Sequence, residues 1–203
     1  MSERGVIIVG TGLITKFHAQ AVNASSKLTL KGFVGRTKEK AAARAAEFGG
    51  EAFDDLDAAF SAPGVGLAVV ATASGAHDEA VFAAARHRVP VLVEKPIAIT
   101  VERTDRMIEV CRETGTPLGC IFQTRWSDEF ARLRKAVDSG ELGRLTYAAV
   151  QVPWWRDNEY YTKSDWHGTK EMDGGGAPYP IDGHEARKSV DLIERIYRDA
   201  GRA

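Results

Sequence analysis

Cysteine is scarce in this chain, with Cys111 and Cys120 the only two among 203 residues. Two thiols cannot build the disulfide framework of a small secreted protein, so we expect a reducing, cytoplasmic location. No apolar run approaches the roughly 20 residues that a membrane-spanning helix needs. The charged start, Ser2-Glu3-Arg4, leads directly into an apolar segment, so we expect no signal peptide and no membrane partner.

The chain also lacks an excess of charge of either sign. It has 27 Lys and Arg against 28 Asp and Glu, for a formal net charge of −1. This balance argues against nucleic acid or an anionic membrane as the main partner. With 44% apolar and 27% charged residues, the composition is ordinary for a globular protein and argues against wholesale disorder. The sequence contains no Cys-x-x-Cys pair, so a thiol-redox function is not indicated.

The first two-thirds of the chain alternate between strand-like and helix-like segments. Short β-branched runs with little polar alternation predict covered strands at 6–9, 28–34, 67–72, 89–94 and 117–122. The stretches between them predict helices at 13–24, 38–48, 75–87 and 101–114. Thr37 and Thr100 are expected to cap the second and fourth helices, and Val101, Ile108 and Cys111 to face inward. Strands alternating with helices indicate an α/β fold with a parallel, doubly wound sheet.

The pattern changes after about residue 124. Residues 127–139 predict an amphipathic helix, residues 144–152 a half-buried strand and residues 183–200 a terminal helix. An aromatic, turn-rich segment lies between the last two. We therefore divide the chain into a first domain, 1–123, and a second, 124–203, whose one strand is too few to form a sheet.

A glycine turn follows the first strand and opens the first helix. Gly10 permits a tight turn, Gly12 permits close approach of a pyrophosphate, and the helix start adds free N–H groups and the positive end of its dipole. Thr15 stands where the third glycine of this motif would be, and is slightly large for close helix–strand packing. A plain structural turn is the alternative to a dinucleotide site. The residues expected to bind the dinucleotide here are Gly10, Thr11, Gly12, Leu13 and Ile14.

An acidic residue is missing from the end of the second strand. NAD enzymes usually place a carboxylate there to hold the ribose 2′-hydroxyl, whereas this chain has Gly35 followed by Arg36. A guanidinium pairs well with a 2′-phosphate, so we expect NADP in preference to NAD. The alternative is that Arg36 is a solvated surface charge.

The fourth expected strand, 89–94, leads into Glu94-Lys95-Pro96. Ligands of open parallel sheets sit beyond the carboxyl ends of the strands, which aims Lys95 at the nicotinamide region. Burial and a neighbouring nicotinium charge would both favour its neutral form, which suits proton exchange with a substrate hydroxyl. In isolation, however, the tripeptide is more typical of a solvated lysine beside a turn proline.

Several motifs occur together, in an order and at a spacing typical of one enzyme family. They are Gly10-Thr11-Gly12…His18, Ala71-Thr72-Ala73-Ser74…His77, Glu94-Lys95-Pro96, Gln123…Arg125, Trp166-His167-Gly168 and Asp173-Gly174-Gly175-Gly176. With this set the chain closely resembles the Gfo/Idh/MocA oxidoreductases. The resemblance implies a Rossmann domain, a C-terminal α+β domain, and NAD(P)-dependent hydride transfer at a secondary alcohol or carbonyl, usually of a sugar or cyclitol. It also implies a homo-oligomer as a possible assembly.

The resemblance implies roles for individual residues of this chain. Lys95 matches the catalytic lysine that touches substrate and nicotinamide, and Glu94 the acidic residue near the nicotinamide ribose. Pro96 is expected to follow a cis bond. Thr72 and Ser74 match residues that line the adenine–ribose side of the cofactor. No metal is implied.

Other matching positions are expected on the cofactor or substrate side. His77 either reaches the cofactor or is a satisfied histidine at a helix start. Gln123 and Arg125 resemble a substrate-side pair, and Trp166 an aromatic residue near the nicotinamide or substrate.

The family's Asp-x-Gly-x-His helix is not recognisable after the glycine run. His184 has the spacing of the catalytic histidine, but Pro178 and Pro180 would break the helix that presents it, and Asp182 looks like a helix cap. We favour an internal deletion that joins the region of Ala177 to the terminal helix, over a repurposed His184. The function expected is thus an NADP-dependent oxidoreductase acting on a sugar-like small molecule. The alternative is a non-catalytic dinucleotide-binding remnant or subunit.

Overall fold

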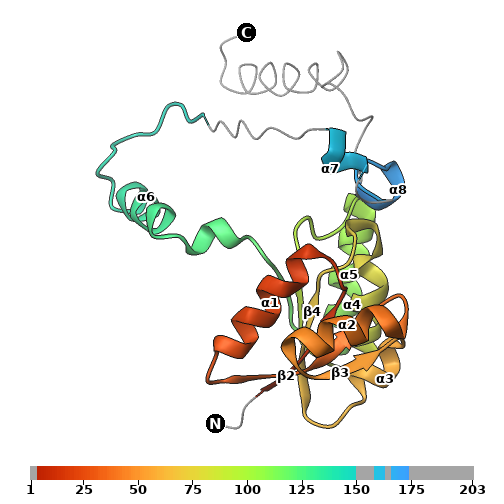
Figure 1. Ribbon diagram of the computed structural model, residues 1–203. Coiled ribbons are helices and arrows are strands. Elements are labelled where there is room, and N and C mark those ends of the chain that lie inside the picture. Colours follow the sequence, from red (N-terminus) through yellow and green to blue (C-terminus); the bar gives the residue numbers. More distant parts are fainter. Residues whose placement is uncertain (1–3, 150–157, 163–165, 174–203) are drawn as a thin grey trace.

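The computed structural model describes residues 4–149, 158–162 and 166–173 of the chain. At its centre is a six-stranded sheet, in which every pair of neighbouring strands is parallel (Figure 1). The strand order is β3-β2-β1-β4-β5-β6, the doubly wound order of a Rossmann fold. The strands are β1 (Arg4–Val9), β2 (Leu28–Val34), β3 (Glu51–Phe53), β4 (Val65–Val70), β5 (Val91–Val93) and β6 (Leu118–Cys120).

Two helices cover one face of the sheet. They are α1 (Leu13–Ala24) and α2 (Lys38–Phe48). Ala19, Val22 and Ala41 from these helices pack with Val6, Ile8, Phe33 and Val69 of the strands. The small helical residues bring the helix backbone close to the sheet, where Phe33 is fully buried.

The opposite face is covered by α3 (Leu56–Phe60), α4 (His77–Arg86) and α5 (Val101–Thr114). Ile7 and Val9 of β1 point to this side, whereas Val6 and Ile8 point to the other. Because both faces are covered, the strands have little polar alternation, as predicted, although β2 begins with the alternating residues Leu28–Lys31. Most of the helical residues in this core come from the alanine-rich α4, together with Met107 of α5.

The expected helix caps are confirmed. Thr37 Oγ1 accepts a hydrogen bond from Lys40 N at 3.4 Å, and Thr100 Oγ1 accepts one from Arg103 N at 3.2 Å. The expected inward face of α5 was partly wrong, because Val101 and Ile108 are exposed while Met107 and Cys111 are buried. A helix turns about 100° per residue, and the face centred on Met107 and Cys111 is the one that meets the sheet.

The short strand β3 and helix α3 were not predicted. After β6, the chain forms the 3₁₀ turn η2 (Gln123–Trp126) and the helix α6 (Asp128–Asp138), which lies apart from the sheet in Figure 1 and buries no residue. The strand predicted at 144–152 was wrong for residues 144–149, which are irregular. No strand of the described ranges lies beside them, and an isolated strand leaves its backbone groups without partners.

Two short helices complete the described part, α7 (Asn158–Thr162) and α8 (Lys170–Asp173). The helix predicted at 183–200, with His184, and residues 150–152 of the predicted strand lie outside the described residues. The boundary at 123/124 remains a prediction. Within the described ranges, no helix is both long and apolar enough to cross a membrane.

Candidate functional site

The loops that carry most of the predicted site residues leave the same edge of the sheet. Val9 of β1 is in register with Val70 of β4, Val70 with Val93 of β5, and Val93 with Cys120 of β6. Each of these strands ends at that level, so the segments beginning at 10, 71, 94 and 121 emerge side by side. This places the glycine turn, the Thr72–Ser74 segment, Glu94-Lys95 and η2 along one crevice-forming edge.

The two glycines of the turn differ in what a side chain would meet. Gly10 has φ +119°, and a Cβ there would overlap the carbonyl oxygen of Ala71. Gly12 has an ordinary φ of −73°, and a Cβ there would meet no atom within 4 Å. Gly10 is therefore required by the fold, whereas Gly12 leaves open space directly before the helix start of Leu13 and Ile14. Open space before the start of a helix is where a phosphate group can approach the backbone closely.

The start of α1 has unused donors. Its N-cap residue is Gly12, and no side chain among the described residues caps it. The first N–H groups of a helix have no acceptor within the helix, so Leu13 and Ile14 offer donors and the positive end of the dipole. Both side chains are exposed.

Thr15 occupies the third glycine position and is fully buried. Its hydroxyl oxygen has no hydrogen-bond partner among the described residues. The fold therefore has room for the Thr15 side chain, which is larger than the glycine of the motif. The buried Thr15 hydroxyl, however, lacks a hydrogen-bond partner among the described residues.

The end of β2 lies against the glycine turn. A Cβ on Gly35 would lie 2.8 Å from Thr37 O and 3.2 Å from Thr11 Cγ2, so this position has no room for a carboxylate side chain. Arg36, the next residue, is exposed. The end of β2 thus carries Arg36 and no acidic residue.

Glu94 is buried at the end of β5 and is held by two donors. His18 Nε2 of α1 lies 2.9 Å from Glu94 Oε1, and Lys95 N donates to Oε2 at 3.1 Å. Burial by itself raises the pKa of Glu94, but the hydrogen bond and charge of His18 and the contacts of Lys95 outweigh it, so the pKa lies below its usual 4.5. Glu94 is therefore ionised at neutral pH. The contact between Glu94 and His18 was not predicted, and His18 was not among the predicted site residues. The only indication in the sequence was the place of His18 in the motif set, after Gly10-Thr11-Gly12.

Lys95 is exposed, so the burial that we expected for it is absent. The residue follows Glu94 in the loop beyond the last ladder pair of β5, where the sheet no longer covers it. The Lys95–Pro96 bond is cis, as predicted.

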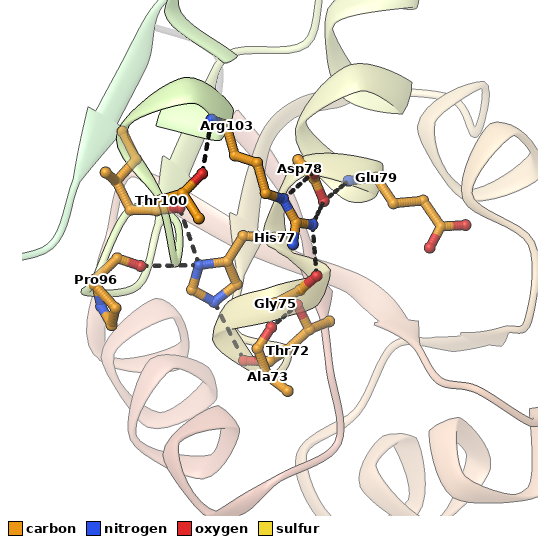
Figure 2. Close-up of polar contacts among 10 residues, drawn as sticks. Thr72, Ala73, Gly75, His77, Asp78, Glu79, Pro96, Thr100 and Arg103 are labelled. Atoms are coloured by element: carbon orange, nitrogen blue, oxygen red, sulfur yellow. Dashed lines mark hydrogen bonds and ion pairs between the residues drawn. The ribbon is translucent and has the colours of Figure 1, made fainter. Parts of the chain in front are cut away.

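His77 connects two of these loops and is 1% exposed (Figure 2). Its Nε2 lies 3.2 Å from Thr72 O, and its Nδ1 lies 3.1 Å from Pro96 O and 3.2 Å from Ile97 O. Burial lowers its pKa, against the opposing effect of these carbonyls and of Glu94. The neutral ring has one N–H, so it donates to one loop at a time. This geometry gives His77 a structural role between the two loops, and a contact of His77 with the cofactor stays a prediction.

Arg103 of α5 joins the same network (Figure 2). Its Nε lies 2.8 Å from Asp78 Oδ2, and its Nη2 donates to Gly75 O at 2.6 Å. The ion pair raises the pKa of Arg103. Together with His77, it fixes the 3₁₀ turn η1 (Ser74–Ala76), which contains the buried Ser74. No sequence motif singled out Arg103.

Trp166, the predicted substrate-side aromatic residue, lies shortly before α8, which packs against η1. A Cβ on Gly75 would overlap Glu171 O and lie 2.6 Å from Met172 Cα, so the backbone of α8 rests directly on this turn. Trp166 precedes α8 and is half-buried, with its ring 4.0 Å from that of His167. A segment almost 100 residues away in the chain is thus brought beside the Thr72–Ser74 loop.

Gln123 and Arg125 lie on η2 and are exposed. Ile121 N donates to Val93 O at 2.8 Å, which places the start of η2 beside the Glu94-Lys95 loop. Arg125 lies over the ring of Phe122, 5.2 Å from its centroid. In the ranges that the structure describes, no cluster of metal-ligating side chains was found.

Comparisons with known proteins place the chain in a family. A family model described as "Oxidoreductase family, NAD-binding Rossmann fold" matches residues 4–122, and a "GFO/IDH/MocA C-terminal domain" model matches residues 130–187. Inositol 2-dehydrogenase 1 of Mycolicibacterium vanbaalenii is 34% identical over 147 residues, which cover 70% of this chain and 43% of that protein. The 2,7-anhydro-N-acetylneuraminate hydratase of Mediterraneibacter gnavus is 29% identical over 121 residues, covering 60% of this chain and 32% of that protein.

A solved structure is similar over most of the chain. The WlbA dehydrogenase from Bordetella pertussis, in complex with NADH and UDP-GlcNAcA, has a TM-score of 0.80 and 30% identity over 94% of this chain and 58% of that one. The chain spans less than half of the length of the curated relatives that it matches. The family model alone covers more than half of this chain, at its N-terminal end. The chain belongs to the Gfo/Idh/MocA oxidoreductase family, whose NAD-binding Rossmann fold it contains.

Proposed function

We propose that the edge formed by the glycine turn binds the pyrophosphate of NADP, with NAD as the alternative nucleotide. The observation that carries the proposal is the open space at Gly12, in front of the uncapped start of α1. Phosphate oxygens accept hydrogen bonds there from the N–H groups of Leu13 and Ile14. Thr72 and Ser74, on the neighbouring loop, are assigned to the adenine–ribose side.

The preference for NADP rests on the end of β2. Gly35 has no room for the carboxylate that holds a ribose 2′-hydroxyl, and Arg36 is exposed beside it. A guanidinium pairs with a 2′-phosphate through charge-assisted hydrogen bonds. The similar WlbA dehydrogenase was solved with NADH, which makes NAD the alternative to be tested.

We assign the chemistry to the segment after β5. A bound nicotinamide supplies the hydride acceptor or donor. Lys95 exchanges the proton of the reacting hydroxyl, and its exposure leaves it accessible to a substrate. The anionic Glu94, held by His18, lies next to it and fixes its backbone N–H.

The proposed substrate is a sugar, cyclitol or related polyol. Relatives named as inositol dehydrogenases and the WlbA complex with a UDP-sugar both support a sugar-like class. Gln123, Arg125 and Trp166 are the side chains assigned to its recognition. Because Cys111 and Cys120 are both free thiols, we retain a reducing cytoplasm as the proposed setting.

A second candidate is a dinucleotide-binding module without catalysis. It is favoured by the glycine turn together with the lack of a recognisable Asp-x-Gly-x-His helix after the glycine run, where Pro178 and Pro180 precede His184. Steady-state assays with NADP⁺ or NAD⁺ and a panel of inositols and sugars distinguish the two. An enzyme would show turnover that Lys95→Met abolishes while the affinity for NADPH is retained. Dinucleotide binding without turnover on any polyol of the panel would favour the module.

A further inference from the structure

Arg44 reaches from α2 to the glycine turn. Its Nε donates to Thr11 O at 3.1 Å, and its Nη2 donates to Gly12 O at 3.3 Å. The third guanidinium nitrogen, Nη1, pairs with Glu47 at 2.8 Å on the same helix. The side chain of Arg44 is 25% exposed, so its head is largely enclosed between α2 and the turn.

The two carbonyl groups that Arg44 binds belong to the peptide units that lead into the start of α1, and one of these units carries the N–H of Leu13, a donor assigned to the phosphate. The carbonyl of Thr11 shares its peptide plane with the N–H of Gly12, and that of Gly12 shares its plane with the N–H of Leu13. In a planar trans peptide the C=O and N–H bonds point in opposite directions. Holding both oxygens on the α2 side therefore turns both N–H groups away from Arg44.

A guanidinium on these oxygens also changes the electrostatics of the turn. Carbonyl oxygens carry partial negative charge, which would oppose a phosphate nearby. Arg44 offsets this charge and polarises the two peptide units, so that their N–H groups become better donors. A lysine would supply the charge but not the planar fork that spans two acceptors.

We propose that Arg44 is a positioning residue for the pyrophosphate, acting through the Thr11–Gly12 and Gly12–Leu13 peptide units and not by touching the cofactor. The inference rests on the proposed function, since it concerns the same phosphate site. It differs from the assignment of Arg36, which acts on the 2′-phosphate alone. Arg44 must therefore affect NADH and NADPH equally, because both contain the same pyrophosphate.

The test is to titrate the Arg44→Met variant of the 203-residue chain with NADH and NADPH by calorimetry, beside wild type and the control variant Glu47→Gln. Methionine keeps an unbranched side chain but has no donors, whereas Glu47→Gln removes the ion pair and leaves both carbonyl contacts. The dissociation constants of Arg44→Met for both dinucleotides should rise by the same factor, about 10- to 100-fold, since two charge-assisted hydrogen bonds orient the site. Those of Glu47→Gln should stay within about twofold of wild type, and Arg44→Lys should recover part of the loss.

Denaturant unfolding of the same variants separates positioning from general support of the fold. Positioning predicts that both affinities fall while Arg44→Met and Glu47→Gln have similar free energies of unfolding. A loss confined to NADPH would overturn the proposal and place Arg44 on the 2′-phosphate. The proposal would also be overturned if Arg44→Met bound NADH and NADPH as tightly as wild type does. That holds even if the free energy of unfolding of this variant were lower. If wild type binds neither dinucleotide, it is the proposed function that fails.

Discussion

Replacing Gly12 with alanine places a methyl group in the space assigned to the pyrophosphate. The backbone of Gly12 has φ −73° and ψ −172°, a conformation that alanine adopts without strain. The added Cβ would meet no protein atom within 4 Å. The substitution therefore probes the ligand space and leaves the packing of the protein unchanged.

Two small effects on the stability of Gly12→Ala oppose each other. Loss of chain entropy in the unfolded state stabilises Gly→Ala changes by about 0.4–1 kcal/mol at compatible sites. Alanine is a poorer N-cap than glycine, which costs roughly 0.5–1 kcal/mol at the start of α1. The free energy of unfolding should therefore stay within about 1 kcal/mol of wild type.

The effect of Gly12→Ala on dinucleotide binding should be much larger. A methyl group keeps the phosphate away from the N–H groups of the turn and the helix start, and hydrogen bonds to a charged group contribute about 1.5–3 kcal/mol each. Losing two of them raises the dissociation constant of NADPH by roughly 100- to 10,000-fold. Calorimetric titration measures the affinity, and denaturant unfolding measures the stability.

Gly10→Ala is the matched comparison. Gly10 has φ +119° and no room for a Cβ beside Ala71 O, so this change should destabilise the fold by about 2–5 kcal/mol. If Gly12→Ala instead bound NADPH as tightly as wild type, the pyrophosphate would not lie over this turn, and the assignment of the site would be refuted.

Three further predictions concern single side chains. Thr15→Val keeps the shape of the buried side chain but removes its unpartnered hydroxyl, so denaturant unfolding should show a gain of about 1–2 kcal/mol; a loss would mean that the hydroxyl is satisfied in solution. Arg36→Ala should weaken NADPH binding by about 10- to 100-fold and leave NADH binding unchanged, whereas an equal effect on both would remove Arg36 from the 2′-phosphate. Because the pKa of Glu94 is lower in the folded state, its contribution to stability is complete above the usual 4.5 and is lost as the pH falls through the folded value. Glu94→Gln should accordingly flatten the acid limb of the stability profile below pH 4.5, and an unchanged limb would contradict the His18–Glu94 contact.

The central sheet was predictable because its sequence pattern is local. Apolar runs and glycine turns predicted five of the strands, and capping threonines predicted the starts of α2 and α5. The short strand β3 was missed, since Glu51–Phe53 has no apolar run and is held in place by pairing with β2. The strand predicted at 144–152 was wrong for residues 144–149. Their alternation is strand-like, but no described strand pairs with them, so they are irregular.

The site was predictable to the extent that the strand ends define it. The places of the glycine turn and of Glu94-Lys95 followed from motifs that lie directly after strands, whereas the cis bond before Pro96 was implied by the family resemblance. The contacts that hold these loops could not be read from the sequence, because His18, Arg44 and Arg103 lie on helices and act across the fold. Such contacts depend on how helices sit on the sheet, which spacing along one segment does not determine.

The most direct test of dinucleotide binding is a calorimetric titration of the 203-residue chain with NADPH and with NADH. The account predicts that NADPH binds with one site per chain and more tightly than NADH, because the end of β2 has Arg36 and lacks the usual carboxylate. Binding of neither nucleotide would contradict the central claim that the space at Gly12 and the start of α1 form a dinucleotide site.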